Sequence, residues 1–236
     1  MGQLGDHSRF ECPASADTRA PTPRGLKRLL LALAAASLVC GTQLLAATPA
    51  GANPGSLAIC CAWNASLASP PPPDHLTYTI AGGDAAAQNE VNTAVQAWVS
   101  ALVGHTAVPF TMTRVSTRTA DIAIRFKEGG GNIQGQTFRS TDATGFIQHV
   151  RIDISGKAFG TPNNAALIDQ ITKHETGHAL GLDHADFNGD LMSPTLTGGS
   201  DTISTCDING VRAAEHWRFV AGSTTPAPPS ATSVAC

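Results

Sequence analysis

The stretch HETGHALGLDH, which begins at His174, constrains the fold more than any other part of this chain. The run before it, AALIDQITK, holds neither proline nor glycine, so we expect a helix that begins at Asn163 or Asn164 and continues through residue 180. His174 and His178 then differ by roughly 40° around the helix axis and about 6 Å along it. Both side chains project from one face and could coordinate one metal ion. Imidazole nitrogen is a common ligand of Zn²⁺.

The third histidine, His184, cannot join the first two on a continuous helix, because the extra residues would carry it roughly 9 Å further along the axis. The chain must therefore stop and turn back. Gly181 permits this, since glycine takes the left-handed conformation of a helix C-cap without steric cost. The spacing predicts two ligands on a helix and a third on the returning chain. Such a set leaves one position for water, which is typical of a catalytic zinc site.

Glu175 lies beside these predicted ligands, displaced about 100° around the helix from His174. It cannot point in the same direction as the histidines, but it can flank the metal. Zinc lowers the pKa of its bound water to near 7, and a neighbouring carboxylate can take the proton. The sequence therefore predicts Glu175 as the general base for attack on a polarised carbonyl.

Composition divides the chain into four parts. Residues 1–47 are an N-terminal extension in which a basic flank precedes the apolar run LLLALAAASLVCGTQLLAA, typical of an export signal, with a retained membrane anchor as the alternative. Residues 48–74 end in SPPPPDH and predict a Pro-rich leader or linker. The compact domain is expected over 75–222, and the Pro/Ser/Thr-rich residues 223–236 as a C-terminal tail.

Charge and hydropathy limit the class of partner. The chain carries 15 Lys and Arg against 18 Asp and Glu, a formal net charge of −3, and it has no basic patch, so nucleic acid is not an expected partner. Hydrophobic residues make up 42% of its 236 residues, which is enough for one well-packed domain.

Periodicity within the compact domain predicts an α/β sandwich. Alternating segments indicate strands, and apolar residues at helical spacing indicate a helix over 85–103 with Asp84 as its N-cap. The expected strands are HLTYTI, PFTMTRV, ADIAIRF and HVRIDIS, whereas GGGNIQGQTF predicts a flexible loop, with a short strand as the alternative. Because a helical crossover follows the first strand, the sheet should be mostly parallel.

The histidine stretch resembles the metzincin signature H-E-x-x-H-x-x-G-x-x-H. Met192, in LMSP, resembles the Met-turn of that clan at the matrixin spacing. The predicted strands and helices follow the order of a matrixin catalytic domain over roughly residues 75 to 220, and CDINGV resembles the start of its last helix. The resemblance implies a zincin-like fold: a twisted, mostly parallel five-stranded sheet with three helices, in which the active-site helix is followed by a Met-turn.

The same resemblance assigns roles position by position. It implies zinc ligands at His174, His178 and His184, the general base at Glu175, the hydrophobic floor at Met192, and a substrate-pocket wall at Ser193 and Pro194. The histidines of a second, structural zinc site are absent, so one catalytic zinc is expected. Calcium is left open, because DFNGD at 186–190 only faintly resembles an oxygen-rich loop.

Four cysteines follow the expected cleavage point: Cys60, Cys61, Cys206 and Cys236. An even set in an exported chain makes them disulfide candidates. A disulfide between the neighbours Cys60 and Cys61 is disfavoured, because it needs Cα atoms about 4.4–6.8 Å apart and a trans peptide holds them at about 3.8 Å. We expect one of the pair to bond Cys206 and the other Cys236. The alternative is that Cys60 or Cys61 reaches the zinc and holds the enzyme latent.

These patterns favour a secreted zinc endopeptidase that acts on proteins or peptides as a monomer. The alternative is a catalytically weak descendant that uses the fold as a binding module, in contact with a membrane only if the N-terminal apolar run stays uncleaved. Glu175 discriminates between the two, since a binding module has no need of a general base and the residue is present.

Overall fold

A computed structural model describes residues 55–64, 75–117, 119–127, 134–155, 164–196 and 199–236. The main sheet has the order β3-β2-β4-β6-β5, with strands β2 (His75–Ala81), β3 (Thr111–Arg114), β4 (Ile122–Lys127), β5 (Gly135–Thr141) and β6 (Ile147–Ser155). Pairing is parallel except at the edge, where β5 runs antiparallel to β6. The predicted five-stranded, mostly parallel sheet is confirmed.

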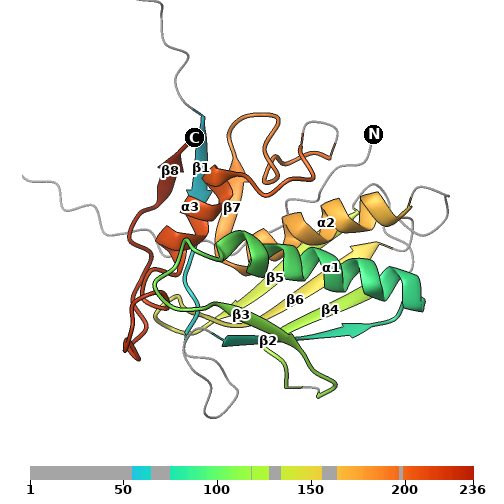
Figure 1. The fold of residues 1–236 in the computed structure, drawn as a ribbon, viewed down its shortest axis with the longest axis horizontal. Helices are drawn as coiled ribbons and strands as arrows, with labels where there is room; N and C mark the ends of the chain where they lie inside the picture. The colour runs from blue at the N-terminus through green and yellow to red at the C-terminus, as the bar shows by residue number, and fades with distance from the viewer. Residues whose placement is uncertain (1–54, 65–74, 118, 128–133, 156–163, 197–198) are drawn as a thin grey trace, which may run out of the picture. The chain divides into compact units, whose positions relative to one another are not determined.

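Helices α1 (Ala85–Leu102) and α2 (Asn164–Ala179) lie side by side on one face of this sheet (Figure 1). The carboxylate of Asp84 accepts a 2.8 Å hydrogen bond from the backbone N–H of Ala87, so the predicted N-cap of α1 is confirmed. Trp98 on α1 is fully buried, and its indole N–H donates to the Lys173 carbonyl at 2.8 Å. The helix that carries HETGH is thus fixed against both α1 and the sheet.

Strand β5 occupies the end of GGGNIQGQTF, the segment for which the sequence predicts a flexible loop with a short strand as the alternative, and the structure shows the strand. It forms a hairpin with β6, and the turn closes at Asp142, whose side chain accepts from the backbone N–H groups of Thr144 and Phe146 at 2.8 and 3.1 Å. Its sequence, GQTFRST, shows no alternation of apolar and polar residues. Hydrophobic periodicity therefore gives only a weak signal for this strand, whose side chains meet α2 through polar groups.

A second, antiparallel sheet has the order β7-β1-β8, made of β1 (Ser56–Ile59), β7 (Leu182–Ala185) and β8 (Ser233–Ala235). Helix α3 (Thr205–Ala214), the third helix that the sequence analysis predicted, packs against all three strands (Figure 1). Composition places β1 in the predicted linker and β8 in the predicted tail, but both strands pair with β7 or β1 and belong to the folded unit. Backbone pairing holds these short strands, so composition gave no sign of them.

The residues that follow β1 are also anchored in the domain. Trp63 is buried, and its indole N–H donates to the carbonyl of Ala179 at 2.7 Å, while its backbone N–H donates to Glu215 at 2.9 Å. Arg218, fully buried, donates to the other oxygen of Glu215 at 3.0 Å and to the carbonyl of Asn64. A buried ion pair with all its hydrogen bonds in place is costly to break, so the stretch through Asn64 is held firmly.

The observed disulfide joins Cys206 to Cys236, whose Cα atoms are 5.3 Å apart. The predicted arrangement, in which each of these two bonds one member of the Cys60 and Cys61 pair, is wrong. The physical reason is β8, which brings the C-terminal residue beside the first turn of α3. Cys60 and Cys61 follow β1, with their Sγ atoms 2.7 Å apart.

Within the described ranges, no helix is both long and apolar enough to cross a membrane. The apolar run at residues 29–47, predicted as a signal or an anchor, lies outside those ranges.

Candidate metal centre

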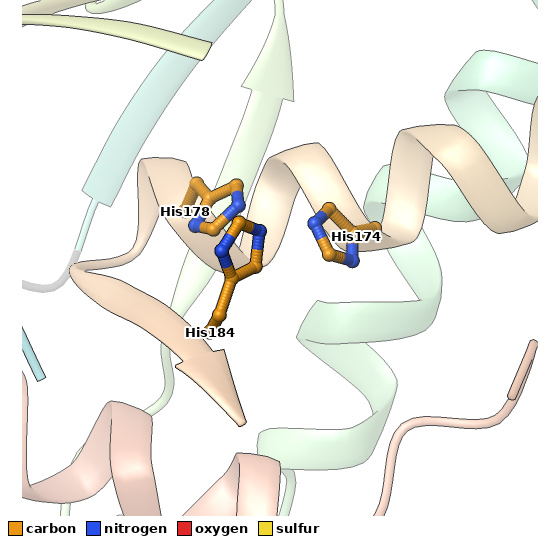
Figure 2. Close-up of side chains that lie close together, drawn as sticks. All are labelled: His174, His178 and His184. Carbon is orange, nitrogen blue, oxygen red and sulfur yellow. The ribbon is translucent and has the colours of Figure 1, made fainter. Parts of the chain in front are cut away.

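Three histidine rings converge at the end of α2 (Figure 2). His174 and His178 project from α2, and His184 comes from β7, as the spacing predicted. One ligand atom from each ring lies within 4.8 Å of the others, and the ring centroids are 4.7 to 5.4 Å apart. In the part of the chain that the structure describes, this is the one cluster of His, Cys, Asp or Glu that could hold a metal ion, and it contains no cysteine.

Backbone carbonyls orient the two helical rings. The Nδ1 atom of His174 lies 2.7 Å from the carbonyl of Leu191, and that of His178 lies 3.0 Å from the carbonyl of Leu182. With Nδ1 as the donor, each ring presents the lone pair of Nε2, and the buried Nε2 of His174 has no hydrogen-bond partner. This donor set fits a zinc ion, because zinc-ligating histidines usually donate their other N–H to such a partner.

Burial keeps both helical histidines neutral. Desolvation lowers the pKa of His174 to about 4 and holds the pKa of His178 well below its usual value. Only the neutral imidazole has a lone pair to give to a metal, so the histidines are ready to bind without first losing a proton.

Gly181 makes the turn that returns His184 to the helix. Its φ is +90°, the left-handed conformation that the sequence analysis predicted, and its N–H donates to the carbonyl of His178 at 3.1 Å. A Cβ atom at this position would lie 2.1 Å from the carbonyl oxygen of Cys61. Glycine is therefore required twice, once for its backbone conformation and once for the close passage of the chain after β1.

Met192 is fully buried and packs against the backbone of α2. A Cβ atom on Gly177 would lie 2.5 Å from the Met192 sulfur, so the absence of a side chain at Gly177 leaves the space that the thioether occupies. The N–H of Ala185 donates to the carbonyl of Met192 at 2.9 Å, which ties β7 to the turn below it. Its role as a hydrophobic floor beneath a bound zinc stays a prediction.

The two residues after Met192 differ in exposure. Ser193 is fully buried, and its hydroxyl donates to the carbonyl of Phe187 at 3.0 Å, whereas Pro194 is exposed. The hydroxyl of Ser193 thus stabilises the turn by linking it to the backbone at Phe187. That Ser193 and Pro194 line a substrate pocket stays a prediction.

Glu175 is 2% exposed and lies between α2 and β5. The hydroxyl of Thr137 donates to its carboxylate at 2.6 Å. Burial raises the pKa of Glu175 to about 7, against the opposing effects of Thr137 and the positive charge of Arg139. A carboxyl group with a pKa near neutrality can both accept and return a proton, which suits the predicted general base.

Three residues of β5 that the sequence analysis did not single out face this helix: Gly135, Thr137 and Arg139. They are spaced two apart, so they occupy one face of the strand. That spacing was the available signal, but it becomes informative only once the segment is known to be a strand beside the histidines.

Two buried carboxyl groups face each other below the Met-turn. Asp190 accepts from the N–H of Met192 at 2.9 Å and from the hydroxyl of Ser204 at 3.0 Å. Asp207 accepts from the N–H of Ser204 at 2.7 Å, as part of the capping box of α3. Burial raises the pKa of Asp207 to about 7, and Asp190 beside it adds to the rise. Two adjacent buried carboxylates cannot both ionise at low cost, so the pair holds a proton at mildly acidic pH.

This pair should make folding stability depend on pH. The folded pKa of Asp207, about 7, exceeds the unfolded value of 3.8, so stability is greatest below the unfolded pKa and falls as pH rises through the folded one. Asp207 contributes a slope that approaches about 1.4 kcal/mol per pH unit between these values, and Glu175 and Glu215, whose pKa burial also raises to about 7, add slopes of the same sign. Urea unfolding of the zinc-saturated protein at pH 5 and pH 7.5 measures it. Because burial is the largest cause of the raised pKa, Asp190→Asn should make the slope shallower without removing it, and an unchanged slope in that variant would mean that the contact between the two carboxyl groups does not contribute.

Comparison with known proteins gives a consistent set of similarities. A family model described as matrixin matches residues 70–214. The chain is 32% identical to an interstitial collagenase of Aquarana catesbeiana over 113 residues, which are 43% of this chain and 28% of the collagenase. It is 30% identical to an interstitial collagenase of Equus caballus over 156 residues, 59% of this chain and 31% of that one. Human matrix metalloproteinase-20 is 29% identical over 128 residues, 50% and 25% of the two chains. The chain thus spans less than a third of the length of these relatives.

Proposed function

The chain belongs to the matrixin family, and on that basis we propose that it is an exported, zinc-dependent endopeptidase that hydrolyses peptide bonds within proteins or peptides. Matrixin relatives such as the collagenases are zinc metalloendopeptidases. The observation that carries the proposal is the convergence of three histidines on one possible metal position, with the buried Glu175 next to His174 on the same helix.

The histidines and Glu175 divide the chemistry between them. His174, His178 and His184 would hold one zinc ion through imidazole nitrogens. When bound, zinc supplies Lewis-acid chemistry, polarising the scissile carbonyl and lowering the pKa of the attacking water. The carboxylate of Glu175 would accept the proton that the water loses and pass it to the leaving amine.

Export is the second part of the proposal. It is supported by the basic flank and apolar run in residues 24–47 and by the disulfide between Cys206 and Cys236, since disulfides persist in oxidising compartments. The expected partners are protein or peptide substrates, and the expected form is a monomer outside the cell, anchored to a membrane only if the apolar run is retained.

A peptide-library cleavage assay tests this function. The purified full chain should cleave internal bonds of some library members, and a zinc chelator should abolish the cleavage. Replenishing zinc should restore it. Cleavage that survives complete removal of zinc would contradict the proposal, because the histidines would then have no catalytic role.

A further inference from the structure

Three alternate residues of β5, Gly135, Thr137 and Arg139, face α2, and each makes a different contact there. At Gly135 a Cβ atom would lie 2.5 Å from the Oε1 atom of Glu175 and 2.6 Å from the side chain of Ile171. Any larger residue would therefore push the Glu175 carboxylate out of its place. The absence of a side chain here creates the space in which that carboxylate sits.

Thr137, two residues along, holds the other carboxylate oxygen. Its hydroxyl lies 2.6 Å from Oε2 of Glu175 and 3.1 Å from the Glu175 backbone carbonyl. A hydroxyl has a single proton to donate, so the shorter contact is the main hydrogen bond. A charge-assisted hydrogen bond of this kind fixes the carboxylate's rotation as well as its position.

Arg139, two residues further, joins both ends of the turn between α2 and β7. Its Nε atom donates to the carbonyl of His178 at 2.9 Å, and Nη2 donates to the carbonyl of Leu182 at 2.6 Å. The carbonyl of Leu182 also accepts from the Nδ1 atom of His178. The guanidinium of Arg139 thus binds the C-terminus of α2, where a positive charge is favourable. It also binds the Leu182 carbonyl, which orients the ring of His178.

We propose that β5 is a positioning strand for the metal centre, in which Thr137 orients the carboxylate of Glu175 and Arg139 fixes the turn that sets the geometry of His178 and His184. The part concerning Thr137 rests on the proposed peptidase activity. The part concerning Arg139 concerns metal binding alone. Neither residue need touch the substrate, so both act through the groups that they hold.

The Thr137 part is tested by removing only the hydroxyl. Thr137→Val should lower kcat about tenfold while KM stays within about twofold and zinc affinity within about threefold of the parent. Thr137→Ser should restore most of kcat, since it keeps the donor. Thr141→Val, at the exposed end of the same strand, is the matched control and should match the parent. In a Glu175→Gln background, Thr137→Val should cause no further loss.

The Arg139 part is tested by zinc affinity, measured by competition with a chelator on the full chain. Arg139→Lys keeps the positive charge but cannot donate to the His178 and Leu182 carbonyls at the same time, as the guanidinium does. It should weaken zinc binding about tenfold. Arg114→Lys is the matched control, because Arg114 donates to Gln88 on α1 and contacts no part of the turn. It should bind zinc as the parent does.

Unchanged kcat in Thr137→Val, or a Thr137→Ser variant as slow as Thr137→Val, overturns the role of Thr137. Unchanged zinc affinity in Arg139→Lys overturns the role of Arg139. If the parent cleaves no peptide at all, the proposed function fails and the Thr137 part fails with it. The Arg139 part is still decided by the chelator competition, so the two failures are distinguishable.

Discussion

Replacing Glu175 with Gln is expected to lower kcat by about 10²-fold or more while one zinc stays bound. The amide has nearly the same shape as the carboxylate and can still accept the hydrogen bond from Thr137, so the helix and the histidines should not move. It cannot take a proton from water, however. Steady-state cleavage of the best library peptide, together with metal analysis of the same sample, measures both quantities.

Glu90→Gln provides the matched control, because it makes the same chemical change on α1, away from the histidines. It should cleave at the parent rate. If Glu175→Gln cleaves as fast as the parent, Glu175 is not the general base. If it loses its zinc instead, the loss of activity would report on the metal and not on proton transfer.

Replacing Gly181 with Ala is expected to have the largest effect on stability and on the metal. Alanine at a φ of +90° is strained, by about 1–2 kcal/mol. The new methyl group would in addition meet the carbonyl oxygen of Cys61 at 2.1 Å, so the turn must shift and His184 must shift with it. We expect a total loss of roughly 3 kcal/mol or more in the free energy of unfolding and zinc binding weakened by about tenfold or more.

Gly145→Ala separates the two causes. Gly145 has a φ of +87°, almost the same backbone strain, but a Cβ atom there meets nothing within 4 Å. Its loss in stability should therefore stay near about 1–2 kcal/mol, with zinc affinity unchanged. Urea unfolding and chelator competition measure both variants. Equal losses in Gly181→Ala and Gly145→Ala would mean that the close passage of the segment after β1 does not constrain the turn.

The histidine turn was predictable from sequence because each of its requirements is local. Helical spacing places His174 and His178 together, and a helix that must reverse before His184 needs a residue such as Gly181. The position of Met192 could come only from the family resemblance. Its packing explains a further detail, since the glycine at 177 makes room for the methionine sulfur.

What the sequence could not predict depends on pairing between distant segments. β1 lies in a stretch without periodicity and is held by backbone bonds to β7 and β8 and by the contacts of Trp63 with Ala179 and Glu215. The partner of Cys206 depends on β8, which follows a proline-rich stretch that is typical of a tail. The roles of Thr137 and Arg139 require knowing that β5 lies beside α2, and no local pattern carries that information.

The most direct test of the metal centre is a titration of zinc into the metal-free full chain, with bound zinc and peptide cleavage followed in the same samples. We expect both to rise together and to saturate at about one zinc per chain, because the described residues offer one group of three histidines. Zinc that binds at this ratio without any cleavage would contradict the central claim and favour a binding module. Activity that appears only with a second tightly bound zinc would contradict the assignment of a single catalytic ion.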